Sequence, residues 1–100
     1  MTETTTRSSL RAGPLLRGGE ISVVAVDAIE EDNPGKEIHV DDHRTYVRVE
    51  AEGGLVIRRE TMERLLGRPF AMQELEVNLT VYSGQIDTHD EYMRWYFIKQ

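Results

Sequence analysis

Glycine and proline divide this sequence of 100 residues into short segments. The breaks fall at Gly13-Pro14, Gly18-Gly19, Asn33-Pro34-Gly35, Gly53-Gly54 and Gly67. Proline disfavours helical geometry in the residue before it, and glycine supplies the positive φ that tight turns need. A single core usually occupies roughly 100 to 150 residues, so this length suits one domain. The sequence therefore predicts a small α+β domain.

Two segments have the spacing of helices. Residues 20–32 are rich in β-branched side chains, which favours a strand, but their apolar positions recur at intervals of three and four residues. The segment is longer than a usual strand, and Glu20 suits the first turn of a helix, so we predict a helix there. A second, shorter helix is predicted at 60–66, with Gly67 as its C-terminal cap.

Other segments alternate between apolar and polar residues, as half-buried strands do. The predicted strands are 13–17, 36–41, 45–52, 55–57, 72–82 and 92–98. Pro14 cannot donate to a sheet, so 13–17 is expected to be an edge strand. The strand at 72–82 is expected to point Leu75, Val77, Leu79 and Val81 into the core, and Ser83-Gly84 allows a bend after it. A polar turn at 87–91 leads to the last strand, whose Trp95 is expected in the core.

The predicted order strand, helix, strand, strand occurs before Gly53, and the elements predicted after it suggest the same order. Because no repeat of residues is visible, a duplication is only a suggestion. Residues 1–12 are mostly small and polar, and we expect them to be a flexible tail. Residues 13–100 are then the single domain.

Composition excludes several classes of function. The net charge of −6 argues against nucleic acid as a partner, because phosphate binding needs clustered Lys and Arg. No apolar run is long enough for a membrane span, and the N-terminus lacks a secretory signal, so we expect a cytoplasmic protein. The absence of cysteine excludes disulfides and thiolate chemistry. Acids concentrate in residues 19–42, either as an ordinary solvated face or as a surface that attracts a basic partner.

Catalytic equipment is not visible in the sequence. His39 and His43 are four residues apart, but they flank a predicted strand end and a turn, so exposed histidines are favoured over metal ligands. The acidic turn at 87–91 lacks the spacing of a calcium loop. No nucleophile has an adjacent base and orienting group. A small metal-binding protein and a generic acidic binding module remain alternatives to any more specific function.

Several stretches resemble the effector, or coupling, proteins of bacterial multicomponent diiron monooxygenases, in the branch of the toluene 4-monooxygenase effectors. The similar stretches, in the same order and spacing, are GPLLRGGE, AIEEDNPGKEIHVDD, TYVRVEAEG, LGRPFAMQELEVNL and SGQI. The resemblance implies an α+β protein without a cofactor or a catalytic site, in which two small, mostly antiparallel sheets pack in a corner with two to three helices.

The resemblance also implies partners and a binding site. The protein would be a monomer when free and would dock on a diiron hydroxylase that holds the metals, while a Rieske-type ferredoxin and a flavin reductase deliver electrons. It would tune the active-site geometry, substrate access and the coupling of oxygen activation to hydroxylation, with toluene, a similar aromatic compound or a small alkene as substrate. The implied hydroxylase-binding residues are Asn78, Thr80, Val81, Tyr82, Ser83, Gly84, Gln85, Asn33 and Pro34.

Overall fold

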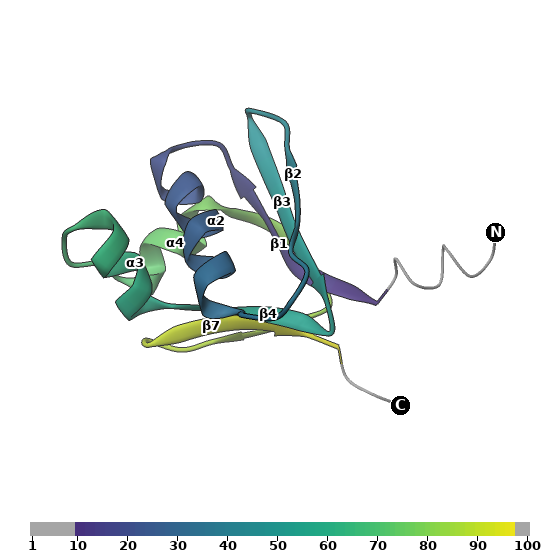
Figure 1. The fold of residues 1–100 in the computed structure, drawn as a ribbon. Coiled ribbons are helices and arrows are strands. Elements are labelled where there is room, and N and C mark those ends of the chain that lie inside the picture. The colour runs from purple at the N-terminus through teal and green to yellow at the C-terminus, as the bar shows by residue number, and fades with distance from the viewer. Residues whose placement is uncertain (1–9, 98–100) are drawn as a thin grey trace.

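Two antiparallel sheets meet at an angle, and the helices fill it, in a computed structural model that describes residues 10–97 (Figure 1). The first sheet has the strand order β2-β3-β1-β5, and the second has the order β4-β7-β6. In chain order the elements are β1 (Arg11–Arg17), α2 (Glu20–Asp32), β2 (His39–Asp42), β3 (Tyr46–Glu52), β4 (Gly54–Arg58), α3 (Arg59–Leu66), α4 (Met72–Asn78), β5 (Leu79–Ser83), β6 (Gln85–Thr88) and β7 (Tyr92–Tyr96). The expected fold class of two sheets with helices is confirmed.

Helix α2 lies in the angle between the sheets (Figure 1). It spans the predicted residues and buries Ser22, Ala25, Ala28 and Ile29. The small side chains of the two alanines let the helix backbone approach its neighbours closely. The Ser22 hydroxyl donates to the backbone carbonyl of Arg17, which ties the first turn of the helix to the end of β1.

The core collects the inward side chains of both sheets. Val47, Val49 and Ala51 of β3 are buried in alternation, as predicted. From the second sheet, Ile57, Met93 and Trp95 are buried, and the exposed fraction of Trp95 is 1%. The predicted helix at 60–66 is confirmed as α3, which ends at Gly67 with a left-handed cap.

Strand β1 is central rather than at an edge, because it pairs with β3 on one side and β5 on the other. The expectation of an edge strand was therefore wrong, and the missing N–H of Pro14 is tolerated inside the sheet. Strand β1 also begins at Arg11, before the domain start expected at Gly13, and Ala12 is fully buried. Of the expected tail at 1–12, residues 1–9 lie outside the described residues.

The predicted long strand at 72–82 was wrong in its first half, which is helix α4. Its alternating pattern also contains the spacing of Met72 and Leu75, three residues apart, and these two side chains are buried. Val77, expected in the core, is 73% exposed, and Val81 is 53% exposed. The burial of Met72 and Leu75 against other elements therefore stabilises a helix here, although the alternation favours a strand.

Helix α4 begins with a polar cap that the alternation conceals. The carboxylate of Glu74 accepts the backbone N–H of Ala71 at 3.3 Å and a guanidinium N–H of Arg68 at 3.1 Å. These hydrogen bonds, Arg68 first and Ala71 second, lower the pKa of Glu74, although partial burial opposes them. Glu74 thus reaches back over the first turn in the manner of a capping box.

The remaining expectations were shifted by a few residues. The strand predicted at 36–41 is β2, at His39–Asp42. The predicted turn at 87–91 is shorter, because Asp87 and Thr88 belong to β6. Between β5 and β6 the chain passes from the first sheet to the second at Gly84, whose φ is +87° and where a Cβ would lie 2.6 Å from the carbonyl oxygen of Tyr96. Only glycine fits this crossing.

The two sheets contain the same unit of strand, helix, strand, strand. In both, the second and third strands form a hairpin, and the third strand pairs with the first. The hairpins also match residue by residue, each as Asp-x-His-x-x-Tyr-x-Arg, in a repeat that our sequence interpretation missed. The matching pairs are Asp41 and Asp87, His43 and His89, Tyr46 and Tyr92, and Arg48 and Arg94.

Each matching hairpin is closed in the same way. The histidine Nε2 lies 2.9 Å from the aspartate in the first hairpin and 3.2 Å in the second. Each histidine ring stacks on the tyrosine, with centroids 4.7 and 4.5 Å apart, and its backbone N–H donates to the tyrosine carbonyl. The units differ at one place, because α4 and β5 are inserted between the helix and hairpin of the second unit.

The burial of Trp95 leads to the first prediction. Trp95→Ala should lower the free energy of unfolding by roughly 3 to 5 kcal/mol, because it leaves a cavity in a thin core. Trp95→Phe should cost less, since it keeps an aromatic ring and removes an indole N–H that is buried without a partner among the described residues. Urea unfolding followed by circular dichroism measures both, and equal stability of wild type and Trp95→Ala would contradict the assignment of Trp95 to the core.

The Glu74 cap leads to a prediction about pH. Because the folded-state pKa is lowered, the cap stabilises the protein fully above the ordinary glutamate pKa of about 4.3, and this contribution is lost as the pH falls through the folded value. Urea unfolding between about pH 6 and about pH 3 should show Glu74→Gln less stable than wild type at the upper pH, with the difference closing as the pH falls. Glu76→Gln, on the exposed side of α4, is the matched control, and a difference independent of pH would contradict the cap.

Candidate functional site

Strand β5 forms one edge of the four-stranded sheet and carries the middle of the predicted binding segment. It follows α4 directly and pairs with β1, and among the described strands none pairs with its other edge. The segment therefore presents main-chain groups as well as side chains at the surface.

A bulge in β5 turns its side chains outward. Leu79 lies opposite Leu16 and Val81 lies opposite Leu15, which leaves Thr80 without an opposite residue on β1. As a result Thr80, Val81 and Tyr82 are all exposed, with 53% of Val81 and 43% of Tyr82 accessible. A bulge at a sheet edge commonly serves to redirect a side chain.

The two ends of this exposed segment are held in place. The amide nitrogen of Asn78 donates to the carbonyl of Glu74 at 2.9 Å, which fixes the half-buried side chain against α4. At the other end the hydroxyl of Ser83 donates to the Glu50 carboxylate at 3.0 Å. Gly13 of β1 lies opposite Ser83, and a Cβ at this position would lie 1.9 Å from the carbonyl oxygen of Val49. Val77 of α4, just before this segment, is also exposed, so apolar side chains reach the surface both before the segment and within it.

Gly84 and Gln85 continue the surface onto the second sheet. Gly84 is half-buried at the crossing, and Gln85 is exposed at the start of β6. The structure therefore brings together seven of the predicted binding residues in one continuous strip, namely Asn78, Thr80, Val81, Tyr82, Ser83, Gly84 and Gln85.

Asn33 and Pro34 lie elsewhere, at the opposite edge of the second sheet. The Asn33 side chain is only 7% exposed, and its amide is fully occupied within the protein. Its nitrogen donates to the carbonyls of Ile29 at 2.6 Å and Val56 at 2.7 Å, and its oxygen accepts the Val56 N–H at 3.0 Å. Asn33 thus makes the hydrogen bonds to Val56 that a neighbouring strand would otherwise make. Pro34, the next residue, is exposed.

Asp32 and Lys36 strengthen the same junction. The Asp32 carboxylate accepts the backbone N–H of Arg58 at 2.9 Å and the hydroxyl of Thr61 at 2.7 Å. Lys36 donates to the carbonyls of Glu52, at 3.0 Å, and Gly54. The contacts of Asp32, Asn33 and Lys36 form a clamp between the end of α2 and β4. Our sequence interpretation missed it, although the run Asp-Asn-Pro-Gly-Lys between a helix and a strand was a visible signal.

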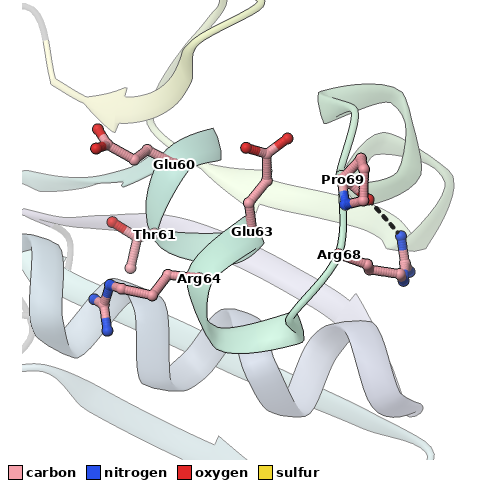
Figure 2. Close-up of a pocket in the computed structure, with 6 residues that line it drawn as sticks. All are labelled: Glu60, Thr61, Glu63, Arg64, Arg68 and Pro69. Carbon is pink, nitrogen blue, oxygen red and sulfur yellow. Dashed lines mark hydrogen bonds between the residues drawn. The ribbon is translucent and has the colours of Figure 1, made fainter.

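A hollow of about 590 Å³ lies beside α3 and the loop that follows it (Figure 2). It is lined by Glu60, Thr61, Glu63, Arg64, Arg68 and Pro69. Its side chains point in different directions (Figure 2). Glu63, Arg64 and Arg68 form ion pairs with residues outside the lining. Arg64 pairs with Glu31, and Arg68 donates to the Pro69 carbonyl at 2.8 Å. The side chains that line this hollow do not form the hydrogen-bonded pair of nucleophile and general base that a catalytic site needs.

The histidines considered as metal ligands are part of the sheet structure. His43 pairs with Asp41 and stacks on Tyr46, while His39 lies opposite Glu50 in the pairing of β2 with β3. Over residues 10–97, no group of three or more His, Asp or Glu side chains is placed to hold a metal ion. In the same residues, no helix is long and apolar enough to cross a membrane.

The chain belongs to the MmoB/DmpM family, which it matches over residues 11–96. It is 35% identical over 85 residues to the effector subunit of the alkene monooxygenase system of Xanthobacter autotrophicus strain Py2, which covers 85% of this chain and 84% of that protein. It is 42% identical over 66 residues to DmpM, the stimulatory component of phenol 2-monooxygenase of a Pseudomonas strain, covering 66% of this chain and 71% of that protein. The expected resemblance to monooxygenase effectors is confirmed.

Solved structures agree with this assignment. A chain in a structure of the phenol hydroxylase–regulatory protein complex superposes with a TM-score of 0.78 at 30% identity, covering 88% of this chain and 99% of that one. A chain in a second such structure gives a TM-score of 0.72 at 31% identity, covering 87% and 99%. The protein is thus an effector component of the multicomponent monooxygenase class.

The internal bonds of Asn33 predict a structural role. Asn33→Ala should lower the free energy of unfolding by roughly 2 to 3 kcal/mol, because it leaves the Val56 groups and the Ile29 carbonyl without their partner. Asn78→Ala, which removes one bond of a half-buried amide, is the matched control and should cost less. Unfolding in urea measures both, and an Asn33 variant as stable as wild type would contradict the clamp.

Proposed function

We propose that the protein binds the diiron hydroxylase of its own monooxygenase system through β5 and the residues that flank it. The observation that carries this proposal is the bulged, exposed edge segment with Val77, Val81 and Tyr82 at the surface. The segment lies in the one insertion that distinguishes the second structural unit from the first, as functional segments added to a scaffold do. Pro34 is kept as an outlying contact, and Asn33 is assigned to the clamp instead.

In this proposal the protein has no active site of its own, and the metals belong to the hydroxylase. It changes the hydroxylase by binding one of its conformations more tightly than another, and a tenfold shift in their ratio needs about 1.4 kcal/mol of differential affinity. A small rigid surface can supply that difference without a catalytic side chain. The consequence is an altered pocket, altered substrate access and better coupling of oxygen activation to hydroxylation.

The other components follow from the same proposal. A Rieske-type ferredoxin and a flavin reductase supply electrons to the hydroxylase, and the effector acts as a monomer in the cytoplasm without a cofactor. The substrate is an aromatic hydrocarbon such as toluene. Adding the protein to its hydroxylase, ferredoxin and reductase should raise turnover or coupling, and no change over a range of ratios would overturn the proposal.

The β5 surface is tested by a double substitution. Asn78→Ala with Thr80→Ala should change the hydroxylation rate or the position of the product at saturating effector, because it removes the exposed Thr80 side chain and the hydrogen bond that fixes Asn78 to α4 beside it. Thr88→Ala, on an exposed strand position of β6, is the matched control and should behave as wild type. Unchanged rate and product distribution from a double variant with a native circular dichroism spectrum would count against this surface.

A further inference from the structure

A second apolar surface lies between the first half of α2 and the hairpin of β2 and β3. It is a groove of about 310 Å³, lined by Gly18, Gly19, Ser22, Val23, Val26, Asp27, Val40, Asp42, Arg44, Tyr46 and Val47. Two of its valines are largely accessible, Val23 at 64% and Val40 at 41%. The fold does not use these two side chains fully, so the groove can receive an apolar group from outside.

Acidic side chains predominate around the groove, whose lining contains Asp27, Asp42 and one basic residue, Arg44. Helix α2 contains no Lys, Arg or His, and its exposed side carries Glu20, Asp27 and Glu30 as well as Glu31, which pairs with Arg64. Asp42 borders the groove from the hairpin, where its carboxylate accepts the backbone N–H of Arg44 at 2.9 Å. A partner that offers an apolar side chain with Lys or Arg beside it would complement both features.

The groove lies one strand away from the β5 surface. On β1, Leu16 pairs with Val47 of the groove on one side and with Leu79 of β5 on the other. A stable protein interface uses about 20 to 30 residues from each partner, which is more than the seven residues of the predicted strip. An interface centred on β5 therefore has to extend, and the groove is an apolar surface within its reach.

We propose that the groove binds an apolar side chain, flanked by basic residues, from the hydroxylase. This inference rests on the proposed function and adds a division of roles. The groove contributes affinity, whereas the β5 strip determines how the bound hydroxylase reacts.

The test is Val23→Arg. The arginine fills the groove, and its positive charge repels the basic residues proposed for the partner. Arginine is a good helix former, and position 23 is exposed, so the fold is preserved. Titration calorimetry with the purified diiron hydroxylase should show Kd raised about tenfold or more. The effector concentration for half-maximal turnover should rise in parallel, while turnover and product position at saturation stay as in wild type.

Leu65→Arg is the matched control, because Leu65 is an apolar side chain, 38% exposed, on α3 and outside the groove. It should bind as wild type does. The combination Asp27→Asn with Asp42→Asn should weaken binding at low ionic strength and have less effect at high salt.

Three results would overturn the proposal: unchanged binding by Val23→Arg, equal losses from Val23→Arg and Leu65→Arg, or a wild-type dimer in sedimentation that Val23→Arg dissociates. The last would assign the groove to a second copy of this chain. If wild-type protein neither binds nor stimulates the hydroxylase, the proposed function itself fails. Failure of the groove alone leaves wild-type stimulation intact, so the two outcomes are distinguishable.

Discussion

The side-chain amide of Asn33 joins the end of α2 to the edge of β4, and the arrangement of the two sheets depends on that junction. One amide group replaces a neighbouring strand for Val56 and also caps a carbonyl of the helix. Asp32 and Lys36 bind the adjoining main chain. Buried amide groups are expensive to leave unpaired, so this junction fixes the helix within the angle of the sheets. A chain with so thin a core gains rigidity from polar contacts of this kind.

The repeated unit explains where the proposed hydroxylase-binding surface lies in the fold. Two hairpins with the same aspartate, histidine, tyrosine and arginine positions build equivalent halves, and each half closes its own sheet. The insertion of α4 and β5 then crosses from the second unit to the first sheet and fastens the halves together. This insertion is anchored by Glu74 at one end and Ser83 at the other, which restricts the movement of its exposed middle. A rigid surface binds with less loss of conformational entropy than a flexible loop.

The strip from Asn78 to Gln85 and the groove beside α2 differ in physical character. The strip is a bulged edge with open main-chain groups, whereas the groove is apolar with mostly acidic side chains around it. An effector that acts by conformational selection needs affinity and discrimination between states, and these need not come from the same residues. Separate surfaces for the two tasks would let a small protein bind tightly without fixing the hydroxylase in a single state.

Local patterns in the sequence determined much of the fold. Helix α2, the alternation of β3, the Gly67 cap and the inward face of β7 all follow from spacing and turn chemistry that act over a few residues. The family was also visible in short stretches of sequence. The strip from Asn78 to Gln85 was named from the family resemblance, and its residues lie together because neighbouring residues on one strand stay neighbours in space.

Tertiary structure alone decided the remaining features. The sequence from Met72 to Asn78 is compatible with both periods, and the choice of helix depends on burying Met72 and Leu75 against distant elements. The central place of β1, the burial of Asn33 and the bulge at Thr80 likewise depend on partners far away in the chain. No local pattern records such partners, because they are set by how the two sheets pack around α2.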